Sequence, residues 1–568
     1  MKTKSAWNDL KRVVLPYWSS PSKGWAWLLF LLALLLTISF INIRISYSER
    51  AVFTALEGKD SSTYWHSLWL YAAVLAGSVP IVGSFGWVKS KLELAWREWL
   101  TTHILDRYLA NRNFVKVTAN LVDNPDERIQ QDVSYFCTEI LTISMALLDS
   151  FLAFCAFVTI LYLISPTLLV VAIVYSAIGT VSTLVFGKRL VGLHYEQQRL
   201  EAEFRYNLVY LRDNAEAIGL YNAGIREGKG LKARLSRLLR NLNSIVSWQR
   251  NLTLFKVTYD YSLIIVPALI SAPLYFAGEI ELGMMVQAAS SFGRVIGALS
   301  VVIAQYQTFA RLSAITSRLS DFVGVLEDIE KQTGEKGVGQ IVTKEAANLA
   351  VDGVTLNTPD GARTLVRNLS FDLKPGSRLI IAGPSGVGKS SLIRAFAGLW
   401  TAGTGAIARP ALDDMMVLPQ ESYMPLGTLR DQFTYPKVGT ESGIADSRIL
   451  AVLKLVNLGE LVENAGGLDA TKHWVEILSP GERQRVAFAR LMLSSPKLVL
   501  LDEATSSLDV DSEAKMYDFV TATGATIVSV AHHKTLIGYH DTVLELMPGG
   551  GWRLIPADVY QQEEESKK

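Results

Sequence analysis

Residues 378–400 read RLIIAGPSGVGKSSLIRAFAGLW, and this stretch assigns the C-terminal half of the chain to a fold class. An apolar run is followed by the pattern GxxxxGKS and then by residues typical of a helix. This order of strand, glycine-rich turn and helix is that of a phosphate-binding loop, whose backbone N–H groups and helix N-terminus attract phosphate oxygens. The predicted nucleotide-binding residues are Gly383, Pro384, Ser385, Gly386, Val387, Gly388, Lys389, Ser390 and Ser391.

Four side chains in or near this loop have expected roles in nucleotide chemistry. Lys389 is expected to reach the β and γ phosphates, and the Ser390 hydroxyl is expected to bind Mg²⁺. A second apolar strand, KLVLLDEA (497–504), ends in two carboxylates. Next to a phosphate-binding loop, Asp502 is the expected Mg²⁺ ligand and Glu503 the group that polarises the attacking water.

Two further segments place a polar side chain beside an apolar run. Gln420, in MVLPQESYM (416–424), is suited to reaching Mg²⁺ or water. His532, in SVAHHKTL (529–536), is expected to donate a hydrogen bond to the γ-phosphate, and His533 is expected to be a solvated neighbour. Strands and helices alternate around these motifs, which predicts an α/β domain with a mainly parallel sheet.

The first half of the chain has the composition of a membrane domain. Apolar residues make up 49% of the chain and charged residues 19%, and the long apolar runs lie before residue 310. A net charge of +1 gives no reason to expect a nucleic-acid partner. The hydropathy predicts six membrane-spanning helices. They cover residues 25–45, 67–88, 140–164, 166–188, 257–277 and 283–308.

Basic residues concentrate in the long connections 89–139 and 189–256. By the positive-inside rule these connections and both termini are predicted to be cytoplasmic. The basic start of the chain resembles a secretory signal, but no small-residue cleavage pattern follows, so the first apolar run is expected to be retained. The two cysteines, Cys137 and Cys155, indicate neither a disulfide framework nor a zinc site.

These observations predict a multi-domain membrane protein. The predicted parts are a cytoplasmic N-terminal segment (1–24), a transmembrane domain (25–329), a linker (330–344) and an ATPase domain (345–568).

The motifs of the second half follow a known order. Residues 345–550 resemble ABC transporter nucleotide-binding domains, because the phosphate-binding loop, Gln420, LSPGERQR (478–485), LLDEATSSLD (500–509) and His532 occur in that succession. The resemblance implies ATP and Mg²⁺ as cofactors. It also implies that Ser479, Gly481 and Glu482 of the signature contact ATP held by a second chain, and that Asp509 belongs to the D-loop.

Two positions depart from the pattern of this family. Pro480 stands where the family usually has glycine or serine, which removes one backbone N–H, although proline suits the first turn of a helix and leaves the Gly481 amide free. Thr358 stands near the place where the family has an aromatic residue that stacks on adenine.

Segments of the membrane half narrow the resemblance to one subfamily of ABC transporters. WREWLT (96–101), DNPDERIQQDV (123–133) and EAEFRYNLVYLRDNAEAIGLY (201–221) are similar to segments of subfamily D half-transporters, the peroxisomal acyl-CoA carriers, and of their bacterial relatives. The bacterial members are linked to the uptake of cobalamin, bleomycin and antimicrobial peptides. This implies an exporter-like (type IV) bundle of six helices, placed in a bacterial inner membrane. The charged NPDERIQQD is either a solvated loop or a surface that couples to the ATPase.

Each chain has one phosphate-binding loop and one signature, so the resemblance implies a homodimer that shares two ATP sites and moves a polar or amphipathic solute, such as a peptide or cobalamin-like compound. The alternatives are an ATP-gated channel or regulatory receptor, and an acyl-CoA or lipid transporter. In the sixth span, Gln287, Ser291 and Arg294 share a helical face and are predicted to line a hydrated cavity. The alternative is that Arg294 snorkels or pairs with an acid such as Asp149 or Asp260.

Overall fold

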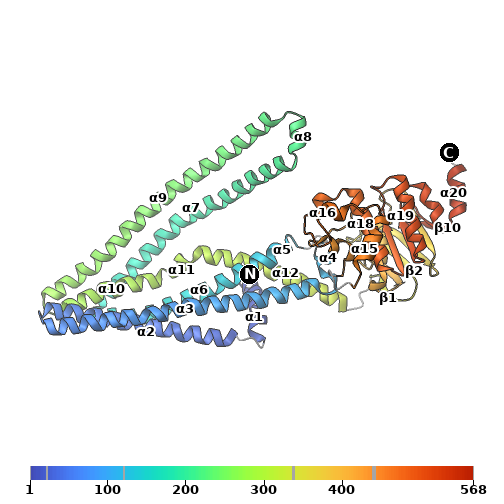
Figure 1. Ribbon diagram of the computed structural model, residues 1–568. Helices are drawn as coiled ribbons and strands as arrows, with labels where there is room; N and C mark the ends of the chain where they lie inside the picture. Colours follow the sequence, from blue (N-terminus) through green and yellow to red (C-terminus); the bar gives the residue numbers. More distant parts are fainter. Residues whose placement is uncertain are drawn as a thin grey trace. The chain divides into compact units, whose positions relative to one another are not determined.

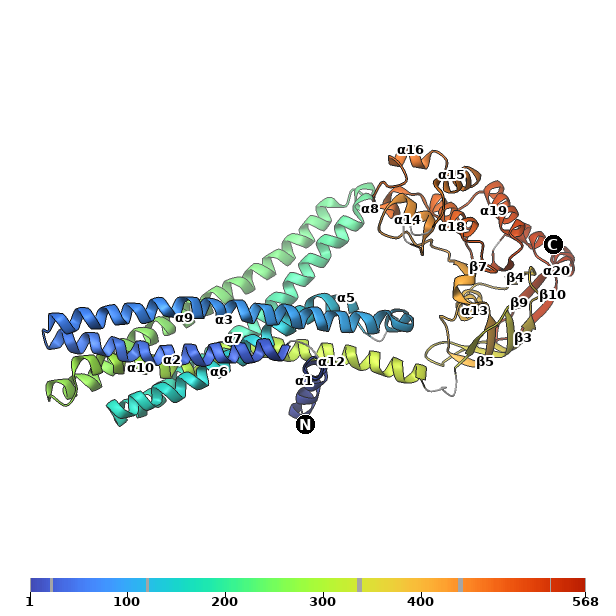
Figure 2. The same ribbon diagram turned by 60° about the horizontal axis from the view of Figure 1, so that its bottom comes forward.

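The computed structural model describes residues 2–20, 24–118, 122–334, 340–437, 443–531 and 533–566 (Figures 1 and 2). By its internal contacts the chain divides into two compact units, Met1–Glu330 and Lys331–Lys568. The first unit is helical, and the second combines sheets with helices.

Long apolar helices form the first unit. In the part of the chain that the structure describes, six helices are long and apolar enough to cross a membrane. A span needs about 20 residues, so the longest of these helices also extend far beyond a bilayer. The six are α2 (Gly24–Glu57), α3 (Ser61–Leu109), α6 (Val133–Ile164), α7 (Pro166–Asp213), α9 (Gly224–Phe276) and α10 (Leu282–Leu299).

Shorter helices flank and connect these spans. At the turn between α2 and α3, the Asp60 side chain accepts hydrogen bonds from the backbone N–H groups of Ser62 and Thr63, which starts α3. The shorter elements are α1 (Lys2–Ser19), η1 (Ala110–Arg112), α4 (Asn113–Thr118), α5 (Pro125–Glu127), the π-helical turn η2 (Arg128–Asp132), α8 (Ala215–Leu220), α11 (Val301–Ala304) and α12 (Tyr306–Gly334).

The sixth predicted span, 283–308, is not one regular helix. α10 ends at Leu299, α11 covers Val301–Ala304, and α12 begins at Tyr306. The N–H of Ser300 is shared between the carbonyls of Ala298 and Ile296, which tightens the turn there. Hydrogen bonds of the i to i−4 type still cross both junctions, so the chain continues as a distorted helix.

Helices α7 and α9 lie side by side as a pair and part from α10–α12 toward the end that carries α8 (Figures 1 and 2). Within the pair, the rings of Tyr175 and Tyr259 stack with their centroids 4.3 Å apart. Gly179 permits this contact, because a Cβ atom there would lie 2.4 Å from the Tyr259 hydroxyl oxygen.

The second unit contains two sheets in its described part. One has the strand order β10-β9-β4-β8-β7-β6, and every neighbouring pair in it is parallel except β10 with β9. The other has the order β1-β5-β2-β3 and is antiparallel apart from β1 with β5. The predicted parallel sheet is therefore present, and a largely antiparallel sheet that the sequence analysis did not anticipate accompanies it.

The strands are β1 (Val342–Glu345), β2 (Ala350–Asn357), β3 (Thr364–Asp372), β4 (Arg378–Ala382), β5 (Gly403–Arg409), β6 (Met415–Leu418), β7 (Leu498–Asp502), β8 (Thr526–Val530), β9 (Thr542–Leu546) and β10 (Trp552–Pro556). The helices are α13 (Lys389–Phe396), η3 (Leu412–Asp414), α14 (Leu429–Thr434), α15 (Asp446–Leu455), α16 (Leu461–Ala465), α17 (Trp474–Ile477), α18 (Pro480–Ser494), α19 (Val510–Ala522), η5 (Lys534–Tyr539) and α20 (Ala557–Ser566).

Two apolar cores hold the motif-bearing elements in place. Leu392 and Phe396 of α13 are buried in one core with residues of both sheets, such as Val354 and Leu379. Phe488 of α18 is buried in the other core together with residues of α14, α15 and β7. The first core fixes the helix that follows the phosphate-binding loop, and the second fixes the helix of the signature.

Candidate nucleotide-binding site

The phosphate-binding loop connects the end of β4 to the start of α13, and its backbone requires glycine. Gly383 has φ +136°, and a Cβ atom there would lie 2.4 Å from the carbonyl oxygen of Leu546. Gly388 has φ +113°, with Leu365 directly against it. A residue with a Cβ atom is strained at such positive φ values. Both positions of this narrow turn therefore require glycine.

Lys389 lies across this loop. Its Nζ donates hydrogen bonds to the carbonyl oxygens of Gly383 at 2.8 Å and Pro384 at 3.1 Å. Burial lowers the pKa of the ammonium, and the nearby carboxylates of Glu503 and Asp502 oppose that shift. The arrangement places a positive charge where phosphate oxygens are expected.

The other loop residues have different environments. Pro384, Ser385 and Gly386 are exposed at the tip, whereas the Val387 side chain is buried and anchors the loop. Ser391 is half-buried in the first turn of α13. All the loop residues predicted from the sequence therefore lie together in space, with Val387 acting through packing.

The predicted Mg²⁺ ligands Ser390 and Asp502 lie in contact. Ser390 Oγ donates to Asp502 Oδ1 at 2.8 Å, although the two residues are far apart in the sequence. Burial raises the pKa of Asp502, and the Ser390 hydrogen bond counteracts this. Among the described residues no cluster of three His, Cys, Asp or Glu side chains that could hold a metal is found. One hydroxyl and one carboxylate suit Mg²⁺, which prefers oxygen ligands and takes the others from water and nucleotide phosphates.

Glu503 follows directly after β7 with an unusual backbone. Its φ is +52°, a left-handed conformation that is uncommon for residues other than glycine. Its N–H donates to the carbonyl oxygen of Val530 at 2.9 Å, which ties it to the end of β8. Gln420 Nε2 donates to Glu503 Oε2 at 3.0 Å. The structure thus brings the predicted water-polarising carboxylate and the predicted glutamine together.

The signature forms the N-terminus of α18. Ser479 is the N-cap, and its hydroxyl accepts from the Glu482 N–H at 3.3 Å. The Glu482 carboxylate accepts from the Ser479 N–H at 2.8 Å, which holds the pKa of Glu482 below its usual range. Pro480 occupies the first helical turn, where its missing N–H has no intrahelical partner to lose. A Cβ atom at Gly481 would lie 3.1 Å from the Ser507 carbonyl oxygen.

Gln484 is a site residue that the sequence analysis missed. It is buried, and its Oε1 accepts from the Ser507 N–H at 3.0 Å. Its Nε2 lies 3.4 Å from the Gln420 carbonyl oxygen and 3.3 Å from Ser506 Oγ. The Gln484 side-chain amide thus links the signature helix α18 to the segment around Gln420 and to the segment that follows Glu503. Its position one turn after Gly481 is the only sequence signal that could have pointed to it.

Asp509 caps α19, since its carboxylate accepts from the Ser512 N–H at 2.9 Å. Close to it, Glu513 is buried and binds Thr505 Oγ1 at 2.6 Å and His533 Nδ1 at 2.8 Å. His533 is exposed to solvent, as expected, with 52% of its side chain accessible. The structure adds that Glu513 holds the ring at Nδ1. The predicted His532 lies outside the described residues.

Thr358 lies in a tight turn. Its hydroxyl donates to Asp360 Oδ1 at 2.5 Å, and it accepts from the Arg363 N–H at 3.1 Å. The side chain that stands near the expected adenine-stacking position is therefore engaged in holding its own turn.

The predicted cavity stripe in the membrane unit requires a correction. Gln287 and Ser291 are 1% and 0% exposed, because α10 packs against its neighbouring helices on this side. Gln287 Nε2 donates to Ser46 Oγ of α2 at 3.2 Å. Side chains with so little exposed surface are not placed to line a hydrated cavity within this chain.

Arg294 differs from these two residues because it is exposed. Its Nη2 lies 3.5 Å from Asn42 Oδ1, and its guanidinium lies 5.7 Å from the centre of the Phe157 ring. Within the described part of the chain no ion pair of 4.0 Å or less joins it to Asp149 or Asp260, although its charge acts on Asp149. The helical face that was predicted from spacing is thus divided between a buried portion and an exposed portion.

The charged segment NPDERIQQD forms α5 and η2. Asp132 is buried, and its carboxylate binds the Arg318 guanidinium of α12 with two hydrogen bonds, one of them 2.8 Å long. The end of this segment is therefore fixed to the membrane unit. Its coupling to the ATPase stays a prediction.

Comparisons with known proteins agree with this geometry. Residues 10–276 match the family model "ABC transporter transmembrane region 2", and residues 366–506 match the model "ABC transporter". An uncharacterized ABC transporter ATP-binding protein of Synechocystis is 42% identical over 93% of this chain and 82% of its own length. The chloroplastic ABC transporter D family member 2 of Arabidopsis thaliana is 34% identical, over 98% of this chain and 89% of its own.

A human relative and a solved structure extend the comparison. The human lysosomal cobalamin transporter is 30% identical, over 97% of this chain and 96% of its own. A bacterial Atm1-family ABC exporter with ATP bound has the same fold, with a TM-score of 0.72, 19% identity, and coverage of 96% of this chain and 97% of that one.

Proposed function

This chain belongs to the ABC transporter family, among the subfamily D transporters and their bacterial relatives, and we propose that it works as a homodimer in which each copy completes the other's ATP site. It is a membrane protein that uses ATP hydrolysis to drive transport. The dimer would contain two ATP sites and six spans from each copy. We place it in a bacterial inner membrane with the ATPase unit in the cytoplasm.

One observation carries the proposal. Ser479 and Glu482 bind each other, and no hydrogen bond or ion pair among the described residues joins the signature start to the loop 383–391. A chain with one loop and one signature that do not meet needs a second copy to cap its nucleotide. In a two-fold dimer each copy supplies the same patch to the other, so both sites become complete together.

Each residue of the site has a separate role in ATP binding or hydrolysis. Lys389 and the loop N–H groups bind the ATP phosphates, and the oxygens of Ser390, Asp502 and Gln420 are suited to hold Mg²⁺, which neutralises phosphate charge. The Glu503 carboxylate accepts a hydrogen bond from water and orients it toward the γ-phosphorus. Gln420 positions that carboxylate by donating to it. This complete set favours a pump over an ATP-gated channel.

The shared site is tested with two inactive variants that are mixed. Lys389→Ala removes the phosphate-binding charge, and Gly481→Asp places a carboxylate where the signature faces phosphate. Each variant homodimer has no working site. A mixed dimer puts both lesions in one site and leaves the other intact, so a complex purified through tags on both chains should regain ATPase activity above either parent.

A tandem fusion of the two chains with a single lesion pair serves as the control, since it shows whether one intact site turns over alone. If that fusion hydrolyses ATP while the doubly tagged mixture stays at background, each chain caps its own nucleotide and the homodimer proposal fails.

The cargo is a polar or amphipathic solute, such as a peptide or a cobalamin-like compound. The name of the human relative and the exposed guanidinium of Arg294 on α10 support this assignment. The test is a screen of solutes for stimulation of ATPase activity in nanodiscs. Arg294→Ala should change which solutes stimulate, whereas Lys232→Gln on the distant part of α9 should not. An unchanged ranking in Arg294→Ala would remove Arg294 from the cargo path.

A further inference from the structure

Two different elements border the phosphate-binding loop. The carboxylates that serve the phosphate end of a nucleotide come from β7, where Asp502 accepts a hydrogen bond from Ser390 Oγ at 2.8 Å. The start of β3 borders the loop at Gly388, because a Cβ atom added there would lie 3.1 Å from Leu365 Cβ. Since the base is at the opposite end of a nucleotide from the γ-phosphate, we expect the base on the β3 side, toward the turn that joins β2 to β3.

This β2–β3 turn is held together by its own hydrogen bonds. The Thr358 N–H donates to the Arg363 carbonyl oxygen at 2.8 Å, and the Gly361 N–H donates to the Thr358 carbonyl oxygen at 2.8 Å. The Asp360 carboxylate accepts from the Thr358 hydroxyl and from the Ala362 N–H. The hydroxyl and the carboxylate of the turn are therefore both used within it.

An indole that contacts the end of β2 is also engaged inside the chain. Trp400 Nε1 donates to the Asn357 carbonyl oxygen at 2.8 Å. The Trp400 ring packs against the apolar core that holds α13. Because its ring belongs to the core and its N–H is used, Trp400 is not suited to stack on a nucleotide base.

Arg363 ends the turn with an exposed side chain. It precedes the first residue of β3 and lies two residues before Leu365, so at most about 7 Å of extended chain separates it from the residue that borders the loop. Among the residues that the structure describes, its guanidinium has no hydrogen bond, ion pair or ring contact; only its backbone N–H and carbonyl are bonded.

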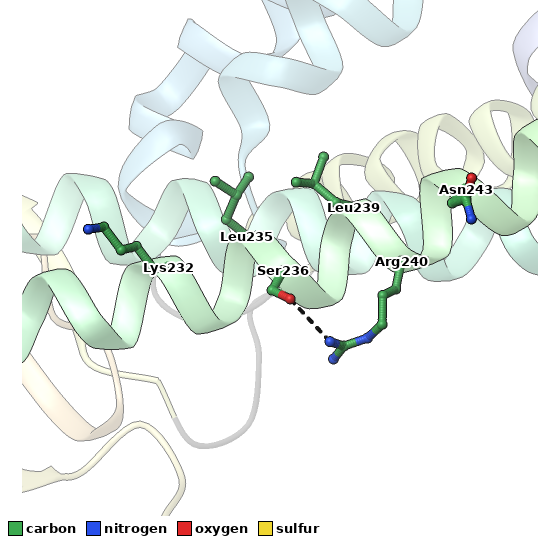
Figure 3. Close-up of a pocket in the computed structure, with 6 residues that line it drawn as sticks. All are labelled: Lys232, Leu235, Ser236, Leu239, Arg240 and Asn243. Carbon is green, nitrogen blue, oxygen red and sulfur yellow. Dashed lines mark hydrogen bonds between the residues drawn. The ribbon is translucent and has the colours of Figure 1, made fainter.

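Two other arginines at the surface show the contrast. Arg240 Nη1 on α9 donates to Ser236 Oγ at 3.1 Å, as Figure 3 shows. Arg378 Nη2 at the start of β4 binds Asp541 Oδ1 at 2.7 Å. Arg363 has neither kind of partner in the described part of the chain, so its planar group is available to a ligand.

A guanidinium can do what an aromatic ring does for a base. It is planar and stacks on aromatic rings, whereas the ammonium of lysine has no plane. Stacking on such a group tolerates different bases, because every base has a π-face.

We propose that Arg363 is the base-binding residue of the ATP site. Its guanidinium stacks on the nucleotide base in place of an aromatic side chain and does not select adenine over guanine. This role rests on the use of ATP at the loop 383–391, and it does not depend on the proposed homodimer.

The test measures binding of ADP, GDP and pyrophosphate, each with Mg²⁺, to the purified full chain by displacement of a fluorescent ADP derivative. ADP and GDP should bind with similar affinity. Arg363→Ala should weaken the binding of both by about tenfold, because the base loses its stacking partner, and should leave pyrophosphate binding unchanged. These ligands lack the γ-phosphate that a partner's signature would contact, so the result is independent of the dimer.

Further variants separate the plane from the charge. Arg363→Lys keeps the charge without the plane and should behave like Arg363→Ala, whereas Arg363→Tyr supplies a ring and should retain binding of ADP and GDP. The matched control is Arg367→Ala, which removes another exposed arginine of β3 whose stem lies against Gly550, and it should bind like the wild type. Melting curves establish that each variant is folded.

Wild-type affinity of folded Arg363→Ala for ADP, or full binding by Arg363→Lys, would overturn the proposal. An equal loss of pyrophosphate binding in Arg363→Ala would assign the guanidinium to the phosphates and also overturn it. A strong preference of the wild type for ADP over GDP would show that polar groups read the edge of the base, against a stacking site. Lys389→Ala should lose all three ligands. If it kept them, the ATP site itself would lie elsewhere, and this failure is distinct from a failure of Arg363 alone.

Discussion

At the scale of single residues, the site depends on a strained position. Glu503 has φ +52° and is held by a backbone hydrogen bond to Val530 and by Gln420. Left-handed backbone in a residue other than glycine costs free energy, and it persists where surrounding contacts impose it. Here those contacts come from the end of β8 and from Gln420.

Glu503→Gln keeps the shape of the side chain but removes the carboxylate. We expect ATP hydrolysis to fall by about 10²-fold or more, because the general base is lost. Binding of ATP with Mg²⁺ should persist through Lys389, Ser390 and Asp502. Steady-state ATPase rates and binding of a fluorescent ATP analogue measure the two effects, and near-normal turnover would mean that another group activates the water.

Gln484 should matter because it joins the signature helix to two other segments of the site. Gln484→Leu leaves the Ser507 N–H without its acceptor, which costs about 1–3 kcal/mol in the stability of the ATPase unit. We also expect slower ATP hydrolysis, since the signature helix loses its link to Gln420. Gln484→Glu keeps an acceptor for the Ser507 N–H but cannot donate to the Gln420 carbonyl, so it should lose less stability while slowing hydrolysis as much as Gln484→Leu does. Denaturation curves and ATPase rates check this, and equal stability of the two variants would contradict it.

His540 gives the ATPase unit a pH-dependent stability. The side chain is buried, and its Nδ1 donates to the Leu536 carbonyl at 2.8 Å. Burial lowers its pKa from 6.5 to about 4. Between these values the unfolded chain binds more protons than the folded one. The contribution of neutral His540 is therefore complete above pH 6.5 and is lost as the pH falls toward 4, by about 3 kcal/mol in total.

The measurement compares the free energy of unfolding at pH 7 and pH 5 in the wild type and in His540→Gln. The glutamine keeps a hydrogen-bond donor and acceptor but does not titrate, so its stability should change less between the two pH values. Parallel changes in both proteins would assign the pH dependence to other groups.

At the scale of elements, the first turn of α18 both caps the helix and carries the signature. Ser479 and Glu482 cap the helix reciprocally, and the same turn presents the signature. Proline at the third signature residue, Pro480, fits this arrangement, because the first helical turn tolerates a missing N–H. The departure from the family pattern is thus compatible with a regular helix start.

Two substitutions separate these functions. Ser479→Ala removes the cap and should lower the stability of the ATPase unit by about 1 kcal/mol. Ser479→Asp restores a capping oxygen, so stability should recover, but its negative charge faces the expected phosphate and ATPase activity should stay low. Thermal melting and ATPase assays give the two readouts. Recovery of activity in Ser479→Asp would place the nucleotide away from this turn.

At the scale of the whole molecule, the proposal requires the loop of one copy to face the signature of another. Cysteines at Ser385 and Ser479, introduced together, should cross-link in the presence of ATP and Mg²⁺ when Glu503→Gln prevents hydrolysis. The exposed native Cys155 is first replaced by alanine, and the buried Cys137 remains. Cross-linked product at the mass of a dimer is the expected result on a denaturing gel, and a cross-link confined to the monomer would contradict the shared site.

The sequence alone predicted those features that local patterns encode. The phosphate-binding loop and the carboxylates at 502 and 503 occupy contiguous motifs, so their residue types and spacing already imply their placement. The membrane spans follow from runs of apolar residues, and helices cover all six predicted segments, because a bilayer demands internal backbone hydrogen bonding over a fixed length. The family could be identified for the same reason.

Only the tertiary structure decided features that depend on distant parts of the chain. Helical spacing put Gln287, Ser291 and Arg294 on one face, but only packing determined that the first two are buried and that Arg294 is exposed. The links of Gln484 and the antiparallel sheet likewise arise from long-range contacts. A local sequence pattern specifies which residues share one face of a helix. The side chains that cover that face come from distant parts of the chain, so only the tertiary structure identifies them.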